Sequence, residues 1–350
     1  MKKETLADKM AKKVFLGKDF QKSWAVHMQA FGPILEPAFE ENYQAKVHLT
    51  AALNKISQRD IRGGMEKLKE VQKYCETNAD KAAWLFFMGV ACEMAGAKEQ
   101  MISCYQQAGE FGHRFYMPYL KVAKAAHSDA VYEAAEENYQ AAIHCFDGQG
   151  LDDQSKIILS SAYTNLGSCL VMMHRYTEAE AAMDTAEQIL SGQRGMDAAR
   201  ALLYAVKQEN EKAEACLARM EKTMPAEVVT ETRKMVEAIA KGEHPHFARQ
   251  NVEADKICAF WDWFVANQAQ LAKLIRDQKT ADFFPLVQEK LAEVFPFLDR
   301  MPELGIQPEE DSITLTLADF YMVSLVDGYQ RLLEACPEAL KADWKFEMAH

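Results

Sequence analysis

Histidine and cysteine side chains occur in two places where their neighbours could give them a chemical role. His244 and His246 flank Pro245 and could ligate a metal ion, but no Cys, Asp or third His follows at ligand spacing. His144 and Cys145 are adjacent, as a base and a thiol nucleophile would be, yet they end a helical pattern in which Cys is usually a core residue. We therefore predict no metal site and no reactive thiol at these positions.

Asp262 lies between Trp261 and Trp263, where aromatic neighbours could raise the pKa of its carboxyl group. On a helix these neighbours point in different directions, so we expect Asp262 to face water. The sequence also lacks a phosphate-binding loop, a nucleophile elbow, a His-Glu-x-x-His motif and a glycine-rich strand-to-helix turn. We predict that the protein is not an enzyme and that it needs no cofactor.

The clearest helical pattern in the sequence lies between residues 163 and 186. Bulky and small residues there share one face of each of two successive helices: Tyr163, Leu166, Gly167 and Leu170, then Ala179, Met183 and Ala186. Small residues such as Gly167 and Ala179 allow two helices to cross closely. This spacing resembles the tetratricopeptide repeat (TPR) family, which implies a helical solenoid that binds other proteins or peptides.

The pattern recurs on both sides of this unit at a period of 34 residues, since Leu217 follows Met183 by that distance and Pro225 falls at the family's closing proline. Upstream, four positions shift in register, from Gly89, Met101, Tyr105 and Ala108 to Ala123, Ala135, Tyr139 and Ala142. A glycine-containing insertion over 146–154 separates Tyr139 from Met183. With a weaker first unit at Gly64, Leu68 and Val71, we predict about five repeats and a C-terminal capping helix over 45–242.

Residues 1–44 are expected to form N-terminal helices that cap the solenoid. Residues 1–22 carry seven lysines against three acids, and Leu6, Met10 and Val14 share a helical face. Such a basic amphipathic helix could instead bind an acidic partner or a membrane surface.

After a linker over 243–256, the 34-residue period disappears, and residues 257–350 are predicted to form a small α+β domain. Two helices come first, over 260–277 and 283–298. Ile313, Leu315 and Leu317 then alternate with polar residues, as expected of a strand. Further strands are expected at Leu304 to Ile306 and at Trp344 to Met348, with a helix over 321–335 between the last two strands. The predicted fold class is therefore mainly α, a TPR-like α-solenoid of helix-turn-helix repeats followed by a small α+β domain.

The resemblance also implies a concave groove lined by the first helix of each repeat. The family's inward positions correspond here to Phe86, Val90, Glu93, Met117, Leu120, Lys124, His127, Thr164, Ser168 and Val171. We expect Phe86, Leu120 and Val171 to act as apolar anchors, and Lys124 and Thr164 to select polar groups. Some members grip a C-terminal carboxylate with lysines, an arginine and asparagines; only Asn165 matches, so that mode is not predicted.

The formal net charge of −12 argues against nucleic acid as a partner. Residues 257–350 contribute 16 acids against 8 bases. Eight scattered cysteines without Cys-x-x-Cys spacing indicate buried thiols in a reducing compartment, and we expect a cytoplasmic, bacterial protein without membrane insertion.

The predicted function is a protein-interaction adaptor or scaffold that binds a protein or peptide ligand. One alternative is an inhibitor or immunity-type protein whose acidic domain blocks a basic partner. The other is a structural subunit that forms a homo-oligomer through the C-terminal sheet edge, which a charge at Phe346 would disrupt.

Overall fold

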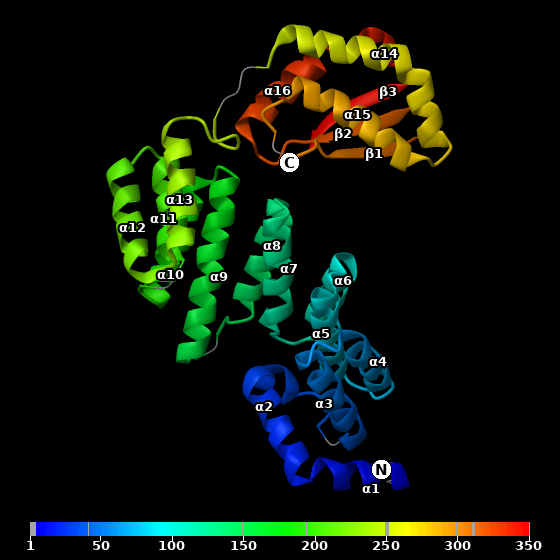
Figure 1. The fold of residues 1–350 in the computed structure, drawn as a ribbon, viewed down its shortest axis with the longest axis vertical. Helices are drawn as coiled ribbons and strands as arrows, with labels where there is room; N and C mark the ends of the chain where they lie inside the picture. Colours follow the sequence, from blue (N-terminus) through cyan, green and yellow to red (C-terminus); the bar gives the residue numbers. More distant parts are fainter. Residues whose placement is uncertain are drawn as a thin grey trace. The chain divides into compact units, whose positions relative to one another are not determined.

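The computed structural model describes residues 5–40, 42–148, 150–192, 195–248, 252–298, 300–309 and 312–349. Contacts divide the chain into two compact units, residues 1–166 with 185–191, and residues 167–184 with 192–350. The chain is mainly α, a TPR-like solenoid of helix-turn-helix repeats followed by a small α+β region, as predicted (Figure 1). The domain boundaries proposed from the sequence stay predictions. Among the described residues, no helix is both long and apolar enough to cross a membrane.

Five helical pairs follow two N-terminal helices in the chain. The N-terminal helices are α1 (Leu6–Phe15) and α2 (Lys18–Leu35). The pairs are α3 (Tyr43–Ser57) with α4 (Ile61–Gln72), α5 (Asn78–Ala95) with α6 (Lys98–Phe111), α7 (Tyr116–Ser128) with α8 (Tyr132–His144), α9 (Asp153–Met172) with α10 (Tyr176–Ile189), and α11 (Met196–Val206) with α12 (Asn210–Thr223). Helix α13 (Ala226–Ala240) packs on the last pair. In the first unit, α4 contacts α5 and α6 contacts α7, which continues the stack from pair to pair.

The turn inside each pair has the same backbone structure. One residue per turn has a positive φ between 59° and 73°: Arg59, Gly96, Ala130, His174 and Gln208. The next residue donates its N–H to the carbonyl five residues back at 2.8–2.9 Å, as Val131 does to Ala126. This is a Schellman ending, which satisfies the last carbonyls of the first helix and reverses the chain.

Small residues allow the helices of a pair to touch, as the sequence predicts. A Cβ atom at Gly167 would lie 2.7 Å from Cγ of Met183 and 3.1 Å from the carbonyl oxygen of Ala179. A Cβ atom at Gly89 would lie 2.7 Å from the ring of Tyr105. Real Cβ atoms essentially never lie 2.7 Å from another heavy atom, so a larger residue at either glycine would force its neighbours to shift.

The C-terminal region is an α+β fold with the predicted elements. It contains α14 (Ala254–Arg276), α15 (Thr280–Val294), β1 (Leu304–Pro308), β2 (Ile313–Ala318), α16 (Val323–Glu334), a short 3-10 turn (Glu338–Leu340) and β3 (Trp344–Ala349). The sheet order is β1-β2-β3, with β1 antiparallel and β3 parallel to β2. Helix α16 is therefore the crossover of the predicted βαβ end, and buried aromatic rings of α14, α15 and β3 form the core.

Candidate partner-binding surface

The predicted groove positions of the first unit lie on α5 and α7, apart from Thr164 on α9. Glu93 and Lys124 are exposed, and the remaining half-buried positions on these helices are Val90, Met117, Leu120 and His127. Partly exposed apolar side chains next to charged ones are typical of a surface that buries area on binding.

An ion pair links the two helices across this surface. The ammonium group of Lys121 on α7 donates to Oε1 and Oε2 of Glu93 on α5 at 3.0 and 2.8 Å. The hydroxyl group of Tyr105 donates to Oε2 of the same carboxylate at 2.8 Å. Sequence reasoning missed Lys121, although it lies one helical turn after Met117 and therefore on nearly the same face.

Glu93 stays ionised in this setting. Its partial burial opposes charge, but the hydrogen bonds from Lys121 and Tyr105, with the nearby charge of Lys124, lower the pKa of Glu93. Burial, together with the hydrogen bond to the same carboxylate, raises the pKa of Tyr105, so this hydroxyl stays protonated as a donor. The surface therefore presents one fixed carboxylate between lysines at neutral pH.

His127 completes the α7 stripe through contacts with its own repeat. Its ring packs edge-on against Tyr132, with centroids 5.8 Å apart, and lies 6.2 Å from the ring of Tyr139. Burial lowers the pKa of His127, so the imidazole is neutral at pH 7.

Three of the predicted positions are buried. Phe86 is 2% exposed, Thr164 6% and Val171 1%. Phe86 packs among the rings of Phe31 and Phe115, with centroids 6.3 and 5.3 Å away. These side chains pack inside the protein. Their contact with a partner stays a prediction, and binding at the exposed positions does not depend on it.

The predicted groove positions on α9 are divided between the two compact units. Thr164 belongs to the first unit, where its hydroxyl donates to the carbonyl of Ser160 at 2.9 Å. Ser168 and Val171 belong to the second unit. The α5 and α7 positions are therefore the part of the predicted groove that one compact unit brings together.

Of the residues considered for chemistry, His144 and Asp262 are exposed and Cys145 is buried. His144 is exposed and pairs with Asp147 at 2.6 Å, while burial raises the pKa of the Cys145 thiol to about 11. That thiol donates to the carbonyl of Ala141 at 3.3 Å and is protonated at neutral pH. Asp262 is exposed, as predicted. Over the described ranges, no cluster of three His, Cys, Asp or Glu residues could hold a metal ion.

The sequence did not predict a histidine pair in the second unit. His246 stacks on His174 with ring centroids 5.2 Å apart and planes 8° apart. Nε2 of His246 lies 2.5 Å from the carbonyl oxygen of Met172, and Nε2 of His174 contacts the carbonyl of Tyr321. These contacts join the α9–α10 turn to the segment after α13 and to the start of α16, and a motif search cannot detect partners so far apart in sequence.

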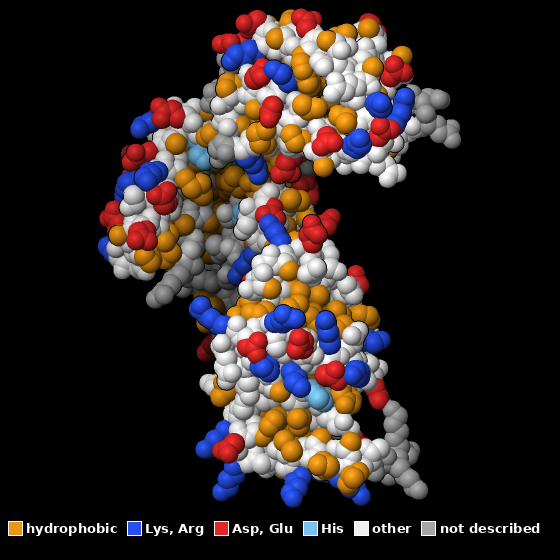
Figure 2. All heavy atoms as spheres, turned by 45° about the vertical axis from the view of Figure 1, so that its right-hand side comes forward, with side chains coloured by type: hydrophobic (Ala, Val, Ile, Leu, Met, Phe, Trp, Pro, Cys, Tyr) orange, Lys and Arg blue, Asp and Glu red, His pale blue; other side chains and the backbone are white. Residues whose placement is uncertain are grey.

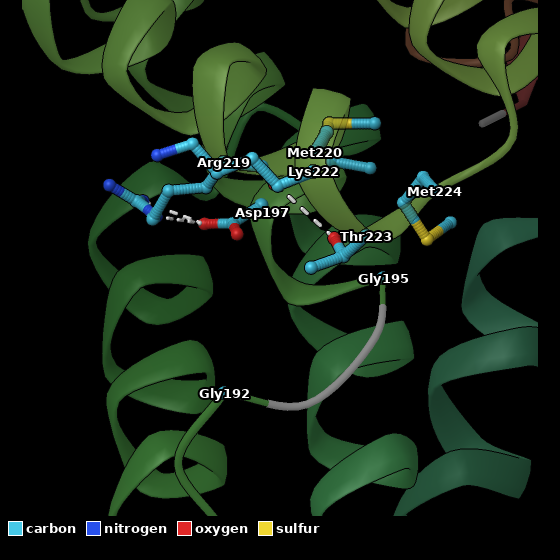
Figure 3. A pocket seen from close by; sticks show the side chains of 9 residues that line it. Gly192, Gly195, Asp197, Arg219, Met220, Lys222, Thr223 and Met224 are labelled. Atoms are coloured by element: carbon cyan, nitrogen blue, oxygen red, sulfur yellow. Dashed lines mark hydrogen bonds and ion pairs between the residues drawn. The ribbon is translucent and has the colours of Figure 1, made fainter.

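A pocket of about 530 Å³ lies beside α11 and α12 in the second unit (Figure 3). Its wall includes Arg219, which pairs with Asp197 at 2.6 Å, and the side chains of Lys222 and Met224. The ion pair offsets the charge of Arg219, and Lys222 adds a second cationic group to the described part of the wall.

No protein-family model matches the sequence. No curated protein matches it either. Among solved structures, this chain is similar to PilF of Pseudomonas aeruginosa at 14% identity, over 56% of this chain and 88% of that chain, with a TM-score of 0.41. The description of the chain as a TPR-like solenoid rests on its own repeated helical pairs, their recurring turn and their glycine contacts.

Proposed function

We propose that this chain is a protein-interaction adaptor that binds a protein or peptide segment along the first helices α5 and α7. The observation that carries this proposal is the Glu93–Lys121 ion pair, which joins the two helices that carry the half-buried apolar side chains of Val90 and Leu120. An extended or helical ligand could bury these apolar groups while its polar groups meet Lys124 and the ion pair.

Charge and burial favour this surface over other parts of the predicted groove. The Glu93 carboxylate already has donors from Lys121 and Tyr105, so binding would not leave it unpaired. Lys124 is exposed and provides a cation for an acidic group of the ligand. Leu120 supplies apolar area beside it.

The test is affinity capture from the source cells with the full-length chain as bait. Full-length variants are preferable to fragments, because a cut near residue 250 would divide the compact unit that contains both 167–184 and 192–350. The surface variants are Leu120→Asp and Lys124→Glu, and the matched controls are Val131→Asp and Lys241→Glu, at exposed positions outside α5 and α7.

We expect both surface variants to lose the partner and both controls to retain it. Val131 is the N-cap of α8, where Asp is a favourable residue, so this control should fold normally. Retention of the same partner by Leu120→Asp and Lys124→Glu would contradict binding at α5 and α7. A partner that is captured independently of these residues would favour the acidic C-terminal region as the binding site.

A further inference from the structure

Helix α1 has apolar side chains on two faces. Phe15 is 7% exposed and points into the protein, whereas Leu6, Met10 and Val14 are 75%, 63% and 52% exposed. The three exposed residues are four positions apart, so they form one strip along the outside of the helix. The strip is therefore built into the helical period and is not a scatter of single exposed residues.

The inner face holds α1 in a defined orientation. The Phe15 ring packs against Trp24 and Tyr43 with centroids 5.6 and 5.5 Å away. At the start of the helix, Thr5 and Asp8 form a capping box, and the amide of Gln44 on α3 donates to Asp8 at 2.7 Å. These contacts fix the strip so that it faces away from the protein.

Further exposed apolar residues lie close to the strip in the sequence. Here Leu16 and Val26 add to the exposed apolar area at 60% and 63% exposure. A surface of this kind is typical of a binding site.

Lysines accompany the exposed apolar residues. Lys9 and Lys13 are exposed on α1 and border the strip on the helical wheel, and Lys18 and Lys22 are exposed on α2. Figure 2 shows lysine side chains beside hydrophobic surface at the end formed by these helices. The surface thus combines apolar contact with positive charge, which complements an anionic partner.

We propose that this outer face of α1 and the start of α2 binds the surface of an anionic lipid bilayer. The apolar strip would enter the boundary between headgroups and acyl chains, and the lysines would contact the anionic headgroups. A symmetric contact between two copies is disfavoured, because it would bring the lysines of both copies together. A bilayer requires only a surface that is both basic and apolar, whereas a protein partner would need a groove shaped to this ridge.

The test is flotation of the full-length chain with vesicles at low salt. One set contains phosphatidylcholine alone, and the other contains phosphatidylcholine mixed with phosphatidylglycerol. The variants are Leu6→Ser with Met10→Ser, and Lys9→Glu with Lys13→Glu. The controls are Val131→Ser, which is 46% exposed in the wild type, and Lys69→Glu with Lys241→Glu.

The wild-type chain should float with the anionic vesicles and stay in solution with the neutral ones. Each α1 double variant should lower the partition coefficient by about tenfold or more, and the controls should match the wild type. Far-UV circular dichroism checks that the variants keep their helical content. Salt should weaken binding by the wild type, since headgroup contacts are screened.

No flotation with anionic vesicles would overturn the proposal, as would equal flotation with neutral vesicles. It would also be overturned if the α1 variants floated like the wild type. If vesicles are not bound but the α1 variants lose an acidic protein that the wild type captures, the surface is a protein-docking site and the lipid proposal is wrong.

Discussion

The imidazole of His246 stacks on that of His174, with ring planes 8° apart and centroids at 5.2 Å. Burial lowers the pKa values of both rings, to about 4 for His246, which is 6% exposed. Both rings are therefore neutral at pH 7, and each presents Nε2–H to a backbone carbonyl. Protonation would place two positive charges in contact and near Arg300.

This arrangement predicts a loss of stability in acid. A depressed folded-state pKa means that the unfolded chain binds the proton first, so the stabilisation is complete above about pH 6.5 and falls as the pH approaches 4. Between pH 6.5 and pH 4, proton uptake at position 246 of the unfolded chain should lower the free energy of unfolding by about 3 kcal/mol. Urea unfolding at pH 7.5 and pH 5 should show a smaller pH effect in His246→Asn than in the wild type, with His113→Asn as an exposed control. An equal pH effect in His246→Asn would contradict the prediction.

Gly167→Ala should destabilise the fourth helical pair. Glycine to alanine normally favours a helix, but here the new methyl group meets Met183 and the backbone of Ala179. We expect a loss of about 1–3 kcal/mol in the free energy of unfolding. Chemical denaturation measures the loss, and a Gly167→Ala chain as stable as the wild type would argue against the close crossing.

Asp80→Ala should be more costly than loss of an ordinary helix cap. The Asp80 carboxylate accepts the backbone N–H of Phe39 at 2.6 Å and those of Glu76 and Thr77 at 3.1 and 2.8 Å. Its removal leaves these donors unpaired at a buried site, at a cost of about 3 kcal/mol. Asp60→Ala, at the exposed N-cap of α4, should cost about 1 kcal/mol. Comparable losses in thermal or urea unfolding would show that the Phe39 contact is unimportant.

Phe346→Asp should unfold the C-terminal region and not merely alter its sheet edge. The Phe346 ring packs against Trp261 and Phe264 with centroids 4.9 and 5.4 Å away. Placing a carboxylate at this half-buried position among aromatic rings should cost about 3 kcal/mol. Met348→Asp, at a 37% exposed position of β3, should change stability by about 0.5 kcal/mol or less. Tryptophan fluorescence reports unfolding, and size-exclusion chromatography shows whether Met348→Asp, the cleaner probe, changes self-association.

Cys258 should be the fast-reacting thiol of the native protein. It is exposed, so the expectation from the sequence that the cysteines are buried is wrong at this position. Burial raises the pKa values of Cys104 and Cys145 to about 11, which suppresses their thiolates. A thiol reagent at pH 7.5 should modify one group rapidly in the wild type and none rapidly in Cys258→Ser. Rapid modification of several thiols in the folded chain would contradict this prediction.

The sequence contains much of the fold because its strongest signals are local. The helical period and small residues such as Gly89 and Gly167 predict the helical pairs. The alternation of apolar and polar residues in Ile313–Ala318 predicts a strand of the βαβ end. The turns between paired helices were less visible, because the positive-φ position is glycine only at Gly96. Residues such as Ala130 adopt this conformation because the Schellman hydrogen bonds and the packing of both helices outweigh its local cost.

The sequence by itself determined which residues share a helical face, since that depends only on the period of the helix. Tertiary packing decided which of them remain open to a partner. Phe86 and Val90 share a stripe, yet rings from α2 and from the start of α7 cover Phe86 and leave Val90 partly exposed. Only the folded chain brings Lys121 to Glu93, or His246 to His174, because these contacts depend on how separate helices stack and not on spacing within one helix.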